Sequence, residues 1–485
     1  MRTKYKLLLL TISLLPLLMS CKKDFFDLPP YDALPAEGSI KSDADLNTIT
    51  NGMYAGLRSA NLYGRTLPVR GDLSADNVYL KNNNSGRYLT FRDFNQTVAN
   101  TDIAGIWNSA YDVIKRANSV IHADLPSSTV VDQLKGEAYA VRALMHFELV
   151  RNFASPYTVE PNGLGIPIVL EYSQSARPGR NSKTEVYNQI VSDLNQAYTL
   201  MTLNQGEDLQ IASTNTSRTT TSAYMSKYAA KALLARVYQH MGQWANARDA
   251  ALDVVNNSGF TLVPAADYED YWANPASTTN RVETIFEVSS DAASNLGTNS
   301  LSNFYSLEGY GDAWVTNELY NLYSANDVRR DVIIANPTGS GTIYLVNKYQ
   351  NTSNPADKDD TKVLRYADVL LILAEAYANL GDETNARSWL NEVATNRIEG
   401  FSGYTSSGAQ LMSDIIRERR LEFAFEGYRY WDLLRLNLPI SNHLKSQSPL
   451  VVFPIAANDP MRIFPIPQHE IDVNENIRDQ QNPGY

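Results

Sequence analysis

Two stretches of the chain repeat one another and decide the expected fold. They read KYAAKALLARVYQHMGQWANARDAALDVVN (Lys227–Asn256) and RYADVLLILAEAYANLGDETNARSWLNEVA (Arg365–Ala394). Aligned without a gap, they share Leu234 with Leu373, Ala235 with Ala374, Tyr238 with Tyr377, Gly242 with Gly381, Ala247 with Ala386 and Val254 with Val393. Small residues let two antiparallel helices approach, glycine ends the first helix, and tyrosine fills the joint. We therefore expect two copies of one helical hairpin.

This pattern is that of the tetratricopeptide repeat. Residues 134–153 and 184–200 look like a third pair, which an insertion at 155–180 splits. Such repeats normally stack directly, yet more than a hundred residues separate the two best copies. The sequence therefore predicts a mainly α fold, in which a tetratricopeptide-repeat scaffold carries long loop insertions and minor β structure. One strand is expected at 283–289.

We expect residues 39–485 to form a single globule with three regions. Residues 39–256 hold the repeat-like helices of the N-terminal half, beginning with a helix capped by Ser42. Residues 257–360 are rich in Asn, Ser, Gly, Tyr and Asp and form the largest insertion. Residues 361–485 are the C-terminal region. Because binding residues tend to lie in loops on a rigid scaffold, 257–360 is the expected ligand region.

The N-terminus has the pattern of a bacterial lipoprotein leader. A basic start precedes the apolar run 7–18, which is too short to span a bilayer, and Leu-Met-Ser-Cys follows at 18–21. Cys21 is the only cysteine in 485 residues, so it cannot form an intramolecular disulfide. We expect a signal peptide at 1–20, lipid attachment at Cys21 and a tether at 21–38. The net charge of −11 argues against a nucleic-acid partner.

A second notable stretch is RERRLEFAFEGYRYWDLLRL, Arg417–Leu436. On one helix, its acids Glu418, Glu422 and Glu426 share a face, at a spacing that a glycosidase carboxylate pair could use. The aromatic and aliphatic residues around them favour a buried helix, in which the acids would be ion-paired. The expected countercharges are Arg419 and Arg429 on the helix, with Arg142 or Arg365 from other helices. We favour the structural interpretation over a catalytic one.

Other signs of catalysis are missing from the sequence. The five histidines make no zinc-binding spacing, and no nucleophile elbow, phosphate-binding loop or dinucleotide-binding fingerprint occurs. We therefore predict no catalytic residues, no metal site and no cofactor.

Several stretches together resemble the SusD/RagB family. ERRLEFAFEGYRYWDLLR at 418–435 looks like the C-terminal signature of that family, and RIFPIPQHEIDVNENIRDQQNPGY at 462–485 resembles its ending. WNSAYDVIKRAN at 107–118, the lipoprotein leader and the interrupted repeats agree. The resemblance implies a non-catalytic, lipid-anchored outer-membrane protein that faces the cell exterior. It also implies capture of a nutrient, usually a glycan, and its delivery to a SusC-like TonB-dependent transporter.

No strict motif of the family marks the ligand residues, so we select them by composition. Sugar binding needs flat aromatic faces beside planar polar groups. Four of the six tryptophans lie on expected helices, which leaves Trp272 and Trp314. The stretch 305–318 adds Tyr305 and the Gly-flanked Tyr310 to Trp314. Ordinary loop or core packing is the alternative for each of these aromatic residues.

A second candidate region is VRGDLSADNVY at 69–79, continuing to Tyr88. Here Arg70, Asp72 and Asn77 are polar partners for sugar hydroxyls, and Tyr79 is an aromatic one. Three further functions stay open at this level: uptake of a peptide, a scaffold that binds only protein, and a glycoside hydrolase. A hydrolase would require an open carboxylate cleft, and a pure scaffold predicts no exposed aromatic surface.

Overall fold

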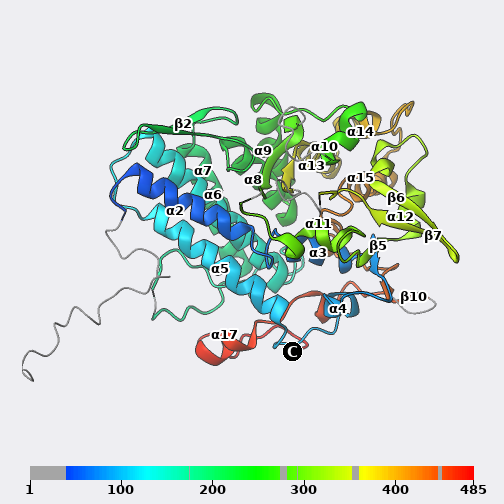
Figure 1. Cartoon of the computed structure of the whole chain (residues 1–485), viewed down its shortest axis with the longest axis horizontal. Coiled ribbons are helices and arrows are strands. Elements are labelled where there is room, and N and C mark those ends of the chain that lie inside the picture. The colour runs from blue at the N-terminus through cyan, green and yellow to red at the C-terminus, as the bar shows by residue number, and fades with distance from the viewer. Residues whose placement is uncertain (1–39, 174, 274–280, 292, 352–359, 446–449) are drawn as a thin grey trace, which may run out of the picture. The chain divides into compact units, whose positions relative to one another are not determined.

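A row of antiparallel helices forms the frame of the molecule (Figure 1). The computed structural model describes residues 40–173, 175–273, 281–291, 293–351, 360–445 and 450–485. Along the row, each helix contacts the next. The row consists of α2 (Asp43–Leu57), α5 (Thr101–Ile121), α6 (Thr129–Phe153), α7 (Lys183–Leu200), α8 (Lys227–Met241), α9 (Trp244–Asn257), α13 (Tyr366–Asn379), α14 (Glu383–Arg397) and α15 (Gly408–Glu422). The predicted helical scaffold is therefore confirmed.

The two best sequence repeats stack directly despite the long segment between them. Helix α9 packs against α13, so residues 258–365 leave the row and return to it. Both hairpins turn at a glycine in the left-handed conformation, Gly242 at φ 69° and Gly381 at φ 83°. The split third pair also forms, as α6 and α7, and Ser182 with Glu185 makes a capping box at the start of α7.

Short helices and strands fill the insertions and the C-terminal region. The short helices are α3 (Thr66–Leu73), α4 (Leu89–Asp93), α10 (Tyr268–Ala273), α11 (Leu301–Tyr305), α12 (Asn317–Leu322), α16 (Arg429–Arg435) and α17 (Gln468–Val473). Strands β1 (Val78–Leu80), β5 (Ala313–Val315), β7 (Gly341–Val346) and β6 (Ile333–Thr338) form one antiparallel sheet in that order. Three antiparallel pairs complete the set: β4 (Thr284–Val288) with β8 (Thr361–Arg365), β2 (Asp208–Ile211) with β3 (Thr216–Thr219), and β9 (Leu444–Lys445) with β10 (Val451–Val452). Strand β4 confirms the strand expected at 283–289.

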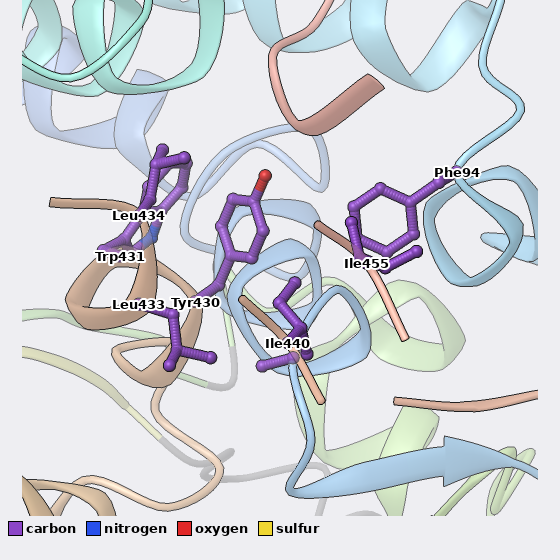
Figure 2. Packing of buried hydrophobic residues seen from close by; sticks show 8 residues of the cluster. Phe94, Tyr430, Trp431, Leu433, Leu434, Ile440 and Ile455 are labelled. Carbon is purple, nitrogen blue, oxygen red and sulfur yellow. The ribbon is translucent and has the colours of Figure 1, made fainter. Parts of the chain in front are cut away.

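Parts of the chain that are distant in sequence share a core. Ala75 and Phe94 from the N-terminal half pack with α16 residues and with Ile440 and Ile455 (Figure 2). Residues 42–485 form one compact unit. The predicted signal peptide, tether and Cys21 lie outside the described residues.

The prediction of one continuous helix at 417–436 is wrong. Helix α15 ends at Glu422, a turn follows, and α16 begins at Arg429. In the turn, Phe425 and Gly427 both adopt positive φ, 70° and 78°. The cause is a close backbone approach to α3, because a Cβ on Gly71 would lie 1.9 Å from the Gly427 carbonyl oxygen. This packing therefore requires glycine in both segments, Gly71 in α3 and Gly427 in the turn.

The three glutamates of that stretch are buried and ion-paired, as the structural interpretation predicts. Glu418 accepts from Arg329, Glu422 lies 2.8 Å from Arg365, and Glu426 lies 2.7 Å from Lys348. We call this cluster the Arg365 network; its members are Glu283, Arg329, Lys348, Arg365, Arg397, Glu418, Glu422 and Glu426.

Of the expected countercharges, only Arg365 contacts these glutamates. Arg419 binds Asp368 and Asp432 instead. Arg429 binds Asp76, and Arg142 binds Asp193. The break between α15 and α16 turns Arg429 away from the face that Glu422 shares with Arg365.

Candidate functional site

The clearest aromatic surface lies where β1 meets β5. Tyr79 pairs in register with Trp314, and their rings contact edge to face with centroids 6.1 Å apart. Their strand neighbours Val78, Leu80, Ala313 and Val315 are buried, whereas both aromatic side chains are half-buried. Alternation along the two strands therefore directs Tyr79 and Trp314 to the more open face.

Tyr310 and Arg87 stand in the two loops that continue these strands. The Arg87 guanidinium lies 4.0 Å from the centre of the Tyr310 ring and donates to its hydroxyl at 3.0 Å. Both side chains are half-buried. Tyr79, Arg87, Tyr310 and Trp314 together are called the β1–β5 aromatic surface below.

Hydrogen bonds hold the two loops together. Asp312 accepts from the Ser85 backbone N–H at 2.9 Å, and Lys81 donates its ammonium to the Tyr310 carbonyl at 2.7 Å. Gly309 sits so close to Asn303 that a Cβ there would clash with its carbonyl oxygen. The surface is therefore set by packing rather than left to loop motion, which favours binding because little ordering is needed. Burial raises the pKa of Tyr79, so its hydroxyl is protonated and can donate at neutral pH.

The polar residues proposed at 70–77 lie inside the protein. Arg70 is fully buried against the Tyr430 and Phe464 rings and donates to the Arg462 carbonyl at 3.0 Å. Asn77 accepts from Arg420 at 2.8 Å. Sequence reasoning treated this stretch as a loop, but its first part, through Leu73, belongs to α3, a helix whose residues are all buried. Asn77 lies in the buried turn between α3 and β1. A ligand on the surface cannot reach these groups.

Asp72 belongs to the same buried helix. It accepts from the Tyr305 hydroxyl at 2.6 Å and from the Gly427 backbone. Burial raises the pKa of Asp72 to about 7. Tyr305 itself is fully buried and stacks on Tyr349.

Trp272 also belongs to the core. It lies on α10 among Tyr268 and Tyr271, with the Lys348 ammonium 4.4 Å from its ring. Arg70, Asp72, Asn77, Tyr305 and Trp272 are therefore packing residues, and the candidate site does not include them. Of the predicted set, Tyr79, Tyr310 and Trp314 stay half-buried. Tyr79 and Trp314 contact each other, and Tyr310 lies in the loop before β5.

Arg87 is the residue that sequence reasoning missed. The sequence drew attention to its neighbour Tyr88, but Tyr88 turns inward at φ 57° and is buried. Nothing in the letters NNNSGRY predicts this reversal. The pairing of β1 with β5 across more than two hundred residues brings Arg87 to Tyr310.

The carboxylates that were considered for catalysis are closed off. Arg397, Arg365 and Arg329 hold the pKa of Glu422 well below its usual range despite its burial. An acid in this state cannot donate a proton as a glycosidase acid must. Over the described ranges, no group of three His, Cys, Asp or Glu side chains is placed to hold a metal ion. In the same part of the chain, no helix has the length and apolar character needed to cross a membrane.

Comparison with known proteins finds relatives of this chain. Residues 331–485 match the model of the SusD family, and residues 24–239 match a model described as starch-binding associating with outer membrane. The chain is SusD-like in both of these regions. The SusD-like protein P2 of Formosa agariphila is 28% identical to it, covering 99% of this chain and 100% of that protein.

Solved SusD-type structures share the fold. A putative sugar binding protein from Bacteroides vulgatus superposes with a TM-score of 0.81 at 27% identity, over 93% of this chain and 100% of that one. A SusD superfamily protein from Bacteroides thetaiotaomicron gives 0.79 at 26% identity, over 91% and 100%. The SusD resemblance inferred from the C-terminal motifs is confirmed.

Proposed function

We propose that this SusD-like chain is a surface lipoprotein that binds a glycan at the β1–β5 aromatic surface. The observation that carries the proposal is the half-buried Tyr79–Trp314 pair, together with the Tyr310–Arg87 pair in the two loops that continue the same strands. The C–H-rich face of a sugar packs on such rings, while its hydroxyls bond to the guanidinium and the phenols. The family model described as starch-binding supports this class of ligand.

The same proposal assigns the chain no catalytic role. Glu418, Glu422 and Glu426, the carboxylates that best fitted a hydrolase, are buried in ion pairs. After binding, the glycan passes to a SusC-like TonB-dependent transporter in the outer membrane. Lipid on Cys21 anchors the protein there, facing the cell exterior. Support for this arrangement comes from the lipoprotein leader and from the family's association with the outer membrane.

The first test is binding by protein that starts after Cys21 and carries no lipid. It would be run through gels that contain a panel of soluble polysaccharides, and each hit would be titrated by calorimetry. Trp314→Ala is the test variant. Trp389→Ala is its matched control, because Trp389 is also a half-buried tryptophan but lies on the repeat helix α14.

We expect retardation by at least one polysaccharide, lost in Trp314→Ala and kept in Trp389→Ala. Truncating a central aromatic contact usually costs about 2 kcal/mol or more, which corresponds to roughly 30-fold in affinity. Binding that survives Trp314→Ala would contradict the placement of the site. Retention on peptides or on the transporter alone, with no polysaccharide binding, would contradict glycan capture.

A further inference from the structure

A hollow separate from the residues discussed so far lies beside the C-terminal end of α2. Its volume is about 190 Å³. Three segments line it: the end of α2, the turn before α8, and the stretch that runs out of β4. Its lining includes Asn51, Arg58, Ala223, Tyr224, Glu287 and Asp291.

The aromatic wall of this hollow is held in place. The Tyr224 ring meets the Tyr54 ring edge to face at 5.2 Å, and the Arg218 guanidinium lies 4.0 Å from its centre. The Tyr54 hydroxyl in turn donates to Glu137 at 3.1 Å and accepts from the Met225 backbone at 2.9 Å. Tyr224 is therefore oriented before any ligand arrives, although its side chain is only half-buried.

Polar groups of both signs surround that wall. Arg58 donates to the Ser289 carbonyl at 3.4 Å and is half-buried, while Asn51 and Asp291 are exposed. Hydrogen bonds from Ser294 and neighbouring backbone amides lower the pKa of Asp291, so it is ionised at neutral pH. Glu287 is buried and accepts from Ser222 at 2.5 Å.

This combination indicates a neutral, hydroxyl-rich ligand of ring size. One guanidinium among two carboxylates gives no strong preference for a small anion. Exposed amide and carboxylate groups, with a half-buried guanidinium, can serve many hydroxyls at once beside a fixed ring. A cavity of roughly 150 Å³ accommodates a single benzene ring, so the hollow suits one sugar ring at the end or in a branch of a chain.

We infer that the Tyr224 hollow is a second sugar subsite, taking one ring of a glycan whose main contact is the β1–β5 aromatic surface. The inference rests on the proposed function, because it takes the ligand to be a carbohydrate. It adds a second contact point, and thereby selects glycans long or branched enough to use both.

The segments that carry the two sites are fastened together. Arg58 contacts Ser289, and further along the same two segments Arg65 donates to Asn299 at 3.2 Å. Arg65 also donates to the Tyr88 hydroxyl at 2.7 Å, next to Arg87. A glycan held at both ends gains affinity through effective concentration without any new contact.

The test measures how many equivalents of a fragment bind to each protein molecule. It uses short and long fragments of the polysaccharide that the gels identify. Calorimetry and ligand-observed NMR would be run on wild type, Ala223→Trp and Trp314→Ala. Ala223 lines the hollow and is half-buried, so the larger side chain fills the space without removing a polar group. The rim double variant Arg58→Gln with Asp291→Asn removes the two rim charges without filling the hollow, and repeats the comparison in case Ala223→Trp fails to fold.

We expect short fragments to bind wild type with two equivalents and each single variant with one. For long fragments, we expect each variant to lose at least about tenfold in affinity. One equivalent in wild type, lost in Trp314→Ala and untouched by Ala223→Trp and by the rim variant, overturns the second subsite and leaves the proposed function standing. No carbohydrate binding by wild type overturns both.

Discussion

The Arg365 network and the β1–β5 aromatic surface consist of the same kinds of side chain in opposite settings. In the network, the Arg365 guanidinium lies 5.3 Å from the Trp272 ring and is fully buried among carboxylates. On the surface, Arg87 lies 4.0 Å from the Tyr310 ring, and both stay half-buried. An arginine beside an aromatic ring is thus not a sign of binding by itself. Access from solvent separates the structural cluster from the candidate site.

The largest effect is expected from Arg365→Leu. This change leaves Glu283, Glu422 and Glu426 buried without their shared countercharge. Breaking a buried ion pair from one side costs about 3–5 kcal/mol, so we expect a loss of that size in the free energy of unfolding, measured with urea.

The matched control is Arg387→Leu, which removes a partly exposed pair with Glu383 and a hydrogen bond to the Ser406 carbonyl. Exposed pairs contribute about 0–1 kcal/mol. Equal losses in the two variants would contradict the view that the buried Arg365 pairs contribute more to stability than a pair near solvent.

Asp72 gives the buried region a pH signature that the surface lacks. Its folded pKa, about 7, lies above its usual value because burial disfavours the charge. As the pH rises, the folded state therefore keeps this proton to a higher pH than the unfolded state does. Its contribution is most favourable below about pH 4 and is lost as the pH rises through about 7, with a ceiling of about 4 kcal/mol.

We expect Asp72→Asn to flatten the dependence of unfolding free energy on pH between about 4 and 7. Tyr305 and Gly427 donate to different oxygens of Asp72, so the amide oxygen keeps only one of the two hydrogen bonds, a loss that lowers stability at every pH. Lys348 and Glu426 are the nearby charges that remain. Asp249→Asn, at an exposed carboxylate, serves as the control. An unchanged profile in Asp72→Asn would show that Asp72 is ionised in the folded protein.

The buried core and the β1–β5 aromatic surface can be compared through the same substitution, tryptophan to alanine, because each contains a tryptophan. Trp272→Ala opens a cavity in a packed core and should cost about 3–5 kcal/mol in unfolding free energy. Trp314→Ala should cost about 1 kcal/mol, since it mainly loses the contact with Tyr79. Urea titration of both variants, with glycan binding measured on the folded Trp314→Ala, tests this. A large loss of stability in Trp314→Ala would make it a packing residue too.

The helical scaffold could be predicted from the sequence because the residues that start and end each helix lie next to that helix in the chain. Ser182 with Glu185 caps α7, and Gly242 and Gly381 end their helices at the expected places. These signals act within a few residues, so one sequence is enough to read them. The stacking of α9 on α13 also follows, since each hairpin must bury its apolar face.

The candidate site could be predicted only in part because it depends on contacts between distant segments. Asp72 and Tyr79 looked alike in the sequence, as two members of one candidate binding region at 69–79. Burial of α3 under the turn at Gly427 hides Asp72, whereas the pairing of β1 with β5 leaves Tyr79 half-open. Neither event has a local signal. Long-range packing thus decided which polar and aromatic residues remain available to a ligand.

The smallest effect is expected at Tyr310, where two substitutions distinguish the contribution of the ring from that of the hydroxyl. Tyr310→Phe removes the hydrogen bond from Arg87 but keeps the cation–π contact. At a half-open site, such a bond contributes about 0.5–1 kcal/mol, so we expect a two- to fivefold loss in glycan affinity. Tyr310→Ala also removes the flat face and should weaken binding by roughly a further tenfold. Calorimetry with the same glycan distinguishes the two. If Tyr310→Phe were as weak as Tyr310→Ala, the hydroxyl and not the ring would be the contact, and the surface would recognise sugars by hydrogen bonding through Arg87 and Tyr310.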